Sequence, residues 1–212
     1  KDMVYALSRK GIVYAIPTAK TAQQSGPRLQ ESAWFGLSSS QATISYSKVQ
    51  TSDQASFSDI ASGSDHLLLL SKTGDVYACA NSSKGNARGQ MGQRVWQHSP
   101  ASNTLEAVKI EGFNNAKATA IAAGDQHSVV LAGDEVYTFG ANTYGQLAFN
   151  FNAESTDVVN PTSVMVNALY PRNLQAKCLS IAAGGRNTFM VVQSEEPGKA
   201  ESRRVDIWCS GT

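Results

Sequence analysis

Short apolar runs separated by glycine turns dominate the hydrophobic pattern, and residues 121–148 hold the best-formed unit. Two β-rich runs, 128–131 and 135–139, lie on either side of a tight turn at Gly133, and Gly140 follows the second run. Two short runs around a Gly-Asp turn are typical of a β-hairpin. The unit shows no helical periodicity, so it predicts antiparallel strands.

The same pattern returns at intervals of 61 and 60 residues. A small-residue segment ending in glycine occurs as IASG at 60–63 and as IAAG at 121–124 and 181–184. A Gly-Gln pair follows the hairpin at 89–90 and at 145–146. Three anchors that agree within one residue indicate an internal repeat. The third position after the glycine is occupied in turn by His66, His127 and Asn187.

The repeat divides the chain into segments. They are a partial copy at 1–14, a long Ser/Gln-rich insertion at 15–58, repeats at 59–119 and 120–179, and a truncated repeat at 180–212 with a charged loop at 194–204. We expect one further strand per repeat, at 108–110 and 164–166, with Pro161 near the start of the second. Alternation at 44–49 predicts one strand inside the insertion.

These elements predict the architecture. Each unit of about 60 residues offers three or four short strands, and one such sheet cannot bury both of its faces alone. Neighbouring sheets bury each other's faces when they stack radially, as the blades of a β-propeller do. The sequence therefore predicts an all-β chain that forms three to four blades of a β-propeller. A linear β-solenoid is the alternative, although its repeats are usually much shorter.

Composition restricts the possible partners. The 212-residue chain is 42% hydrophobic and 17% charged, so it can bury a core. Its net charge of +1 gives no overall attraction to phosphate, and we expect no nucleic-acid partner. Cys79, Cys178 and Cys209 are far apart and lack metal-ligand spacing, which favours reduced thiols. No apolar stretch approaches the roughly 18 residues of a membrane span.

The repeat resembles that of the regulator-of-chromosome-condensation family. The resemblance rests on IAAGDQHS at 121–128, YTFG at 137–140 and GQL at 145–147, with a strong copy at 60–92 and weaker ones at 1–14 and 181–211. The family forms seven-bladed propellers from repeats of this length. The resemblance therefore implies that the chain is part of a larger propeller and packs against the remainder of that propeller.

Softer matches resemble the fungal mitochondrial members of this family. They include VYAIP at 13–17, ESAW at 31–34 and NALY at 167–170. Such members are associated with the mitochondrial inner membrane and with assembly of respiratory or ribosomal complexes. The resemblance therefore implies a mitochondrial location, with the nucleus or the cytoplasm as the alternative.

Nine repeat positions are expected to have structural roles. Glycine is needed where φ is positive or where blades approach closely. A histidine in each blade is most simply a buried hydrogen-bonding bracket between strand and turn. Asn187 can form hydrogen bonds but cannot carry charge, which suits this role. The nine positions are Gly63, His66, Gly74, Gly124, His127, Gly133, Gly140, Gly184 and Asn187.

Two groups of residues are candidates for partner binding. In the founding family member, an exchange factor for the small GTPase Ran, acidic and histidine side chains at the histidine position line the GTPase-binding face. Asp65 and Asp125 match those acidic residues, so the resemblance makes them candidates. Trp34 and Phe35 form an aromatic pair in the long insertion and are candidate anchors for a protein partner. Packing against the side of the propeller is the alternative for this pair.

Motifs for catalysis are absent from the sequence. Asp125 and His127 lack an adjacent nucleophile, because Ser128 would point to the opposite face of the strand. Neither G-x-S-x-G, H-E-x-x-H nor G-x-x-x-x-G-K-[ST] occurs. We therefore expect no catalytic residue, no metal and no cofactor, and a protein that is not an enzyme.

Two functions remain open. The first is a scaffold that binds other proteins, namely mitochondrial assembly intermediates, during biogenesis of a respiratory complex or of the mitochondrial ribosome. The second is a guanine-nucleotide exchange factor for a small GTPase, which rests on the family resemblance and on Asp65 and Asp125.

Overall fold

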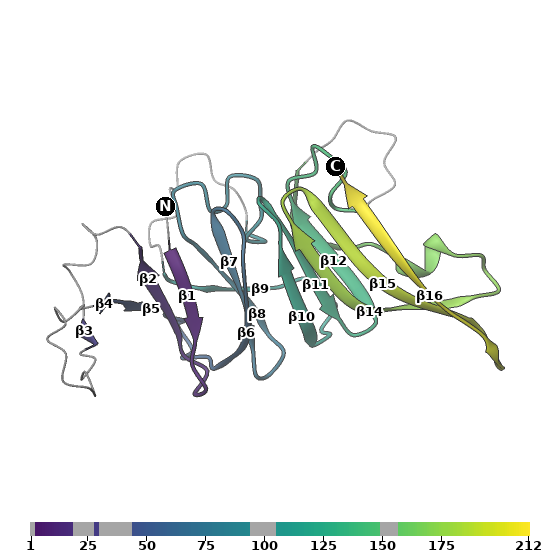
Figure 1. Ribbon diagram of the computed structural model, residues 1–212, viewed down its shortest axis with the longest axis horizontal. Coiled ribbons are helices and arrows are strands. Elements are labelled where there is room, and N and C mark those ends of the chain that lie inside the picture. Colours follow the sequence, from purple (N-terminus) through teal and green to yellow (C-terminus); the bar gives the residue numbers. More distant parts are fainter. Residues whose placement is uncertain (1–2, 19–27, 30–43, 94–104, 149–156) are drawn as a thin grey trace, which may run out of the picture.

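The chain folds almost entirely into antiparallel sheets. The computed structural model describes residues 3–18, 28–29, 44–93, 105–148 and 157–212. In Figure 1, four main sheets stand side by side in chain order, with a small two-stranded sheet beside the first. The all-β prediction is confirmed, and we refer to the four main sheets as blades 1 to 4.

The blades have three or four strands each. Blade 1 contains β1 (Met3–Leu7), β2 (Val13–Pro17) and β5 (Ser47–Lys48). Blade 2 contains β6 (Phe57–Ser62), β7 (His66–Ser71), β8 (Val76–Ala80) and β9 (Val108–Ile110). Blade 3 contains β10 (Ala118–Ala123), β11 (His127–Ala132), β12 (Glu135–Gly140) and β13 (Val158–Ser163). Blade 4 contains β14 (Gln175–Gly184), β15 (Asn187–Glu196) and β16 (Lys199–Gly211). The remaining elements are β3 (Arg28–Leu29), β4 (Ile44–Ser45) and the 3-10 helix η2 (Val166–Leu169).

The second strand of each central blade is buried on both faces. In β7, Leu67 and Leu69 join the core between blades 1 and 2, whereas Leu68 joins the core between blades 2 and 3. In β11, Val129 packs against blade 4, whereas Val130 packs against blade 2. Successive strand residues point to opposite faces, so burial of both faces requires a continuous apolar run.

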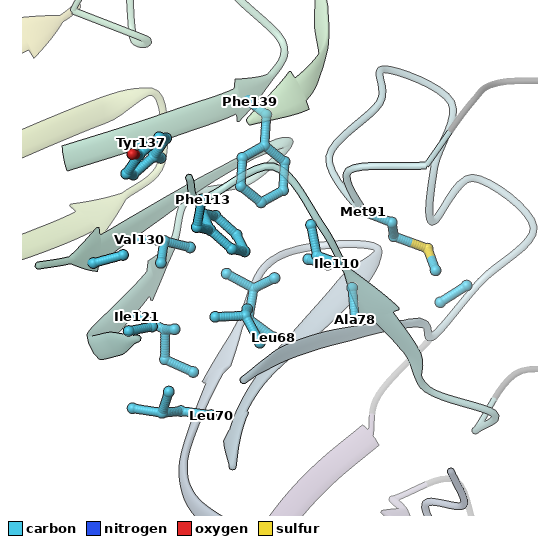
Figure 2. Close-up of a cluster of buried hydrophobic side chains, with 14 residues drawn as sticks. Leu68, Leu70, Ala78, Met91, Ile110, Phe113, Ile121, Val130, Tyr137 and Phe139 are labelled. Carbon is cyan, nitrogen blue, oxygen red and sulfur yellow. The ribbon is translucent and has the colours of Figure 1, made fainter. Parts of the chain in front are cut away.

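The core between blades 2 and 3 shows how the sheets interlock. Figure 2 shows Leu68 of β7 among side chains that include Ile121 of β10 and Ile110 of β9. The rings of Phe113 and Tyr137 meet edge to face with centroids 5.4 Å apart. This core therefore draws on every strand of blade 2, with Ala61 of β6 packed at its margin, and on segments far apart in the sequence.

The first strands of blades 2, 3 and 4 carry the same irregularity. The pairing register shifts between Phe57 and Asp59 in β6, between Ala118 and Ala120 in β10, and between Cys178 and Ser180 in β14. A bulge bends its strand and increases the local twist. The bulge is thus part of the repeat, although the sequence pattern did not predict it. The boundaries expected at 120 and 180 fall inside β10 and β14, because these strands begin before the small-residue segment.

Two predicted strands differ from those observed. The segment 164–166 is not a strand, because Met165 adopts φ 55° and η2 begins at Val166. The fourth strand of blade 3 is instead β13, which lies at a sheet edge where Pro161 costs no ladder hydrogen bond. The strand expected at 44–49 is divided into β4 and β5.

The charged segment 194–204 is not the expected loop. Residues of β15 and β16 pair through this region up to Glu196 and Lys199, so it is the outer half of a long hairpin. The hairpin projects beyond the blade in Figure 1. Cross-strand ion pairs join Arg203 to Glu195 at 2.9 Å and Lys199 to Glu196 at 3.0 Å. Opposite charges on paired strands stabilise the strand conformation, which composition alone did not indicate.

Candidate functional site

Two loops of each central blade meet on one face of the molecule. One loop joins the first and second strands and has the sequence Gly-x-x-His, at 63–66 and 124–127. The other follows the third strand and has the sequence Asn-x-x-Gly-Gln, at 86–90 and 142–146. The corresponding loop of blade 4, at 184–187, ends in asparagine. These loops build the candidate site.

The Asn-x-x-Gly-Gln loop is shaped by its own side chains. In blade 2, the Asn86 amide oxygen accepts the backbone N–H of Met91 at 3.0 Å. The Gln90 amide oxygen accepts the backbone N–H of Arg88 at 2.8 Å. Blade 3 repeats both bonds through Asn142 and Gln146, with the backbone N–H groups of Leu147 and Tyr144 as donors. The residue before the glycine is therefore held outward, and it differs between the blades.

Histidine side chains join consecutive blades through buried hydrogen bonds. His66 Nε2 lies 2.9 Å from Ser128 Oγ of blade 3, and Ser128 Oγ donates to the Gln90 carbonyl at 2.7 Å. One blade later, His127 Nε2 lies 2.9 Å from Thr188 Oγ1, which donates to the Gln146 carbonyl at 2.7 Å. We call these two arrangements the interblade histidine bonds.

The partners of each histidine fix its protonation. Because the Ser128 and Thr188 hydroxyl hydrogens bind carbonyls, the histidine Nε2 atoms are the donors and carry the ring protons. Both Nδ1 atoms are buried without a hydrogen-bond partner. Desolvation by burial lowers the pKa of His66 to about 3 and that of His127 to about 4. Both imidazoles are therefore neutral at physiological pH and suited to bonding rather than proton transfer.

The glycines of the Gly-x-x-His loops make room for the histidine rings. A Cβ atom on Gly63 would overlap the His66 ring, and one on Gly124 would overlap the His127 ring. Gly184, which precedes Asn187 in blade 4, has open space at the same position. The Gly-x-x-His spacing is thus explained by close packing. Positive φ explains other repeat glycines, including Gly74 at 79°, Gly133 at 61° and Gly140 at 107°.

Backbone bonds connect the Gly-x-x-His loops from blade to blade. The Ser64 N–H donates to the Asp125 carbonyl at 3.1 Å, and the Asp125 N–H donates to the Gly185 carbonyl at 2.7 Å. The Ser64 hydroxyl also donates to the Asp125 carboxylate at 3.1 Å. Equivalent positions of three blades therefore form a continuous hydrogen-bonded row.

A cavity of about 350 Å³ opens beside this row at the junction of blades 2, 3 and 4. The Arg186 guanidinium lies over the Tyr144 ring, 4.2 Å from its centroid. Arg88, from the blade 2 loop, pairs with Asp157 at 2.9 Å. Polar lining residues include Ser64, Arg88, Asp125, Tyr144, Gln146 and Arg186. A cavity of this kind fits a polar side chain of a partner better than an apolar one.

The structure separates the two predicted aspartates. Asp125 lines the cavity. Asp65 does not, and its carboxylate accepts the Ser82 hydroxyl of the same blade at 2.5 Å. The repeat explains the difference, because Asp65 directly precedes His66 whereas Asp125 stands two residues before His127. Trp34 and Phe35 lie outside the described residues.

Sequence reasoning missed Arg88, Tyr144 and Arg186. Arg88 and Tyr144 both stand directly before a Gly-Gln pair, so alignment of the two Asn-x-x-Gly-Gln loops would have marked them as one exposed, variable position. Arg186 occupies the position of Asp65 and Gln126 in the preceding copies. A residue that differs in charge between copies is a signal for a local role, which the search for shared positions overlooked.

The described ranges of the chain contain no group of three or more His, Cys, Asp or Glu side chains arranged to hold a metal ion. They also hold no helix with the length and apolar character that a membrane crossing needs.

Comparisons with known proteins agree with the repeat. A family model described as "Regulator of chromosome condensation (RCC1) repeat" matches residues 134–191, and a second model of the same description matches residues 118–146. The yeast protein FMP25, mitochondrial, is 25% identical over 98% of the chain, which spans 40% of that relative. The yeast guanine nucleotide exchange factor SRM1 is 25% identical over 91% of the chain, which spans 36% of that relative.

The fold agrees with a solved structure as well. Yeast RCC1 (Prp20) bound to Kap60 superposes with a TM-score of 0.61, at 24% identity, over 91% of this chain and 39% of that one. The chain thus spans about two fifths of these relatives. Residues 118–191 therefore match the regulator-of-chromosome-condensation repeat, and the four main sheets of the chain are blades of a β-propeller.

Proposed function

We propose that this chain is a protein-binding β-propeller module that catalyses no reaction and acts in the assembly of a mitochondrial complex, either a respiratory complex or the mitochondrial ribosome. The observation that carries protein binding is the polar cavity where loops of blades 2, 3 and 4 meet. Loops held by a rigid sheet scaffold are common sites of partner recognition. The mitochondrial part is supported by the likeness to FMP25 over nearly the whole chain.

Localisation and capture test this proposal together. The tagged full-length protein is expected to fractionate with mitochondria. After mild cross-linking, its purification from mitochondria should enrich subunits of unfinished respiratory complexes or of the ribosome above a mock purification. A protein confined to the nucleus, or a mitochondrial protein that enriches no such subunit, would sink the proposal. Trp34 and Phe35 remain predicted anchors, and alanine variants of both should reduce the enrichment.

Guanine-nucleotide exchange on a small GTPase is the second candidate. It is supported by the likeness to SRM1 and by the exposed Asp125 carboxylate in the cavity. Release of a fluorescent guanine nucleotide from candidate GTPases tests it. Exchange activity should be lost in Asp125→Ala and kept in Asp65→Ala, which removes the same group outside the cavity. Absence of stimulated release by the full-length protein would exclude this candidate.

A further inference from the structure

Arg186 has an unusual set of contacts within the cavity. Its guanidinium lies over the Tyr144 ring, and no carboxylate among the described residues forms an ion pair with it. Arg88 differs, since Asp157 already pairs with it. A guanidinium carries five N–H donors in its plane, and contact with a ring through its face leaves these donors available. Among the described residues, the Arg186 guanidinium therefore has no side-chain hydrogen bond, and its donors face the cavity unused.

The cation is held before any ligand arrives. Tyr144 is fixed by its loop, because the Gln146 side chain binds the Tyr144 backbone N–H at 2.8 Å. Arg186 follows Gly185, whose carbonyl accepts the Asp125 N–H at 2.7 Å. Restricting an arginine in advance reduces the entropy lost on binding. Arg186 and Tyr144 thus form a preorganised donor site on two neighbouring blades.

The charge of the cavity restricts the ligand. Asp157 pairs with Arg88, and Asp125 places a carboxylate in the same cavity, so the net positive charge there is too small to hold a polyanion such as a nucleic-acid backbone. A single carboxylate can reach Arg186 while a neighbouring N–H of the ligand donates to Asp125. A protein segment with one acidic side chain next to exposed backbone N–H groups meets both requirements.

We infer that this cavity binds an aspartate or glutamate side chain of a partner protein, with Arg186 as the donor and Tyr144 as its platform. The inference rests on the proposed protein-binding function and specifies its chemistry. Arginine and carboxylate form two parallel hydrogen bonds, which gives geometric specificity as well as affinity. The pairing is particular to the junction of blades 3 and 4, since Asp65 and Gln126 stand at the position of Arg186 in the preceding blades.

Site-directed photo-cross-linking in the full-length protein tests the inference. A benzophenone amino acid at Thr143, an exposed residue of the cavity lining, should cross-link to a partner segment that contains an acidic residue. Arg186→Gln should weaken binding of that partner about tenfold to a hundredfold, as expected for hydrogen bonds between charged groups. Changing the partner's acidic residue to its amide should weaken binding equally, and the double change should add little.

Matched variants separate recognition from general charge and from folding. Arg172→Gln removes the same charge from an exposed residue outside the cavity lining and should leave binding unchanged. Tyr144→Phe keeps the platform and should retain binding, whereas Tyr144→Ala should reduce it. Full binding by Arg186→Gln, a cross-linked segment without an acidic residue, or cross-links to RNA alone would overturn the inference. If Arg186→Gln still captured the partner, the proposed protein-binding function would stand without the inference. If the wild type captured no partner, both the proposed function and the inference would fail.

Discussion

At the scale of single residues, the ring of His127 leaves no room for a side chain at position 124, which is why glycine stands there. Gly124→Ala should lower the free energy of unfolding by about 1–3 kcal/mol, because the new methyl group would overlap the His127 ring and force it to move. Urea unfolding of the purified chain measures the change. Gly184→Ala is the matched control and should have little effect, because its Cβ would meet open space. Equal effects of the two substitutions would contradict this explanation of the Gly-x-x-His spacing.

The interblade histidine bonds predict a pH dependence. Burial lowers the pKa of His66 to about 3 and that of His127 to about 4. Between these values and about pH 6.5, both imidazoles therefore stay neutral in the folded protein, whereas the same imidazoles bind protons in the unfolded chain. Their contribution to stability is therefore complete above about pH 6.5 and is lost as the pH falls towards 3–4.

Urea midpoints measured from about pH 7.5 down to about pH 5.5 should fall with the pH, before most carboxylates titrate. His127→Asn introduces the residue that the next copy of the repeat has at this position, Asn187, and should flatten this dependence. A wild-type midpoint that rises on acidification, or a slope unchanged by the substitution, would show that these histidines do not control it.

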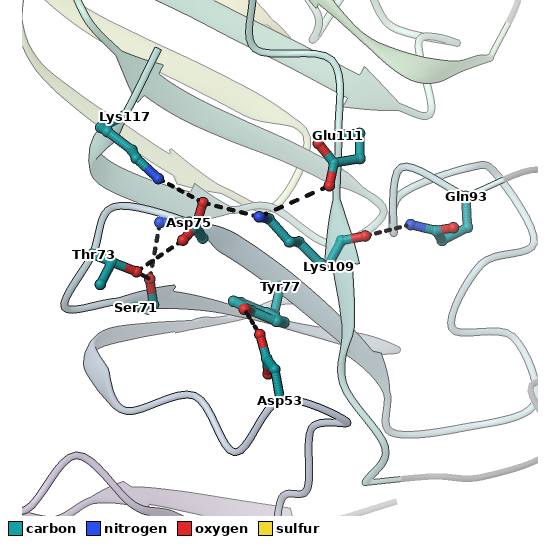
Figure 3. A network of polar contacts seen from close by, with 9 residues as sticks. All are labelled: Asp53, Ser71, Thr73, Asp75, Tyr77, Gln93, Lys109, Glu111 and Lys117. Atoms are coloured by element: carbon teal, nitrogen blue, oxygen red, sulfur yellow. Dashed lines mark hydrogen bonds and ion pairs between the residues drawn. The ribbon is translucent and has the colours of Figure 1, made fainter. Parts of the chain in front are cut away.

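At the scale of elements, the turn between β7 and β8 ties two blades together. Figure 3 shows Asp75 between Lys109 of β9 and Lys117, which precedes blade 3. The Asp75 carboxylate lies 2.9 Å from Lys117 Nζ, 3.2 Å from Lys109 Nζ and 2.8 Å from the Thr73 hydroxyl that donates to it. Hydrogen bonds from Lys117 and Thr73 lower the pKa of Asp75 to about 2.

Removing the charge of Asp75 should therefore weaken the junction. Asp75→Asn is expected to lower the free energy of unfolding by roughly 0.5–1 kcal/mol, since the lysines are exposed and solvent screens the pairs. The loss should shrink between about 0.05 and 0.5 M salt. Glu111→Gln is the control, because Glu111 is 82% exposed and 3.9 Å from Lys109. A salt-independent loss would indicate that the Thr73 hydrogen bond, rather than the ion pairs, dominates.

At the scale of the whole molecule, stability comes from the cores between blades. Val130 of β11 is fully buried between blades 2 and 3, whereas Val108 of β9 is 45% exposed. Val130→Ala should lower the free energy of unfolding by roughly 1–3 kcal/mol, from lost burial and the remaining cavity. Val108→Ala makes the same chemical change and should cost much less. Comparable losses, measured by thermal unfolding, would mean that the sheets are stabilised individually.

The sequence could mark candidate positions where the signal was repeated and could not where it was not. The histidine and glycine positions were marked because more than one copy shows them, and Asp125 was reached through the family resemblance. Arg186 and Tyr144 are 42 residues apart in sequence and lie on different blades. Only the stacking of blade 4 on blade 3 brings the guanidinium over the ring, so neither residue could be selected from its own copy.

The sequence by itself determined the all-β class, the repeat of about 60 residues and the propeller architecture. These follow from local causes, namely short apolar runs, glycine turns and the need to bury both faces of each sheet. Tertiary structure decided the rest. The recurring bulge, the partners of the histidines and the cavity at Arg186 depend on how strands and blades pack together, and the long β15–β16 hairpin depends on its cross-strand pairs. The local pattern of apolar residues specifies none of these contacts.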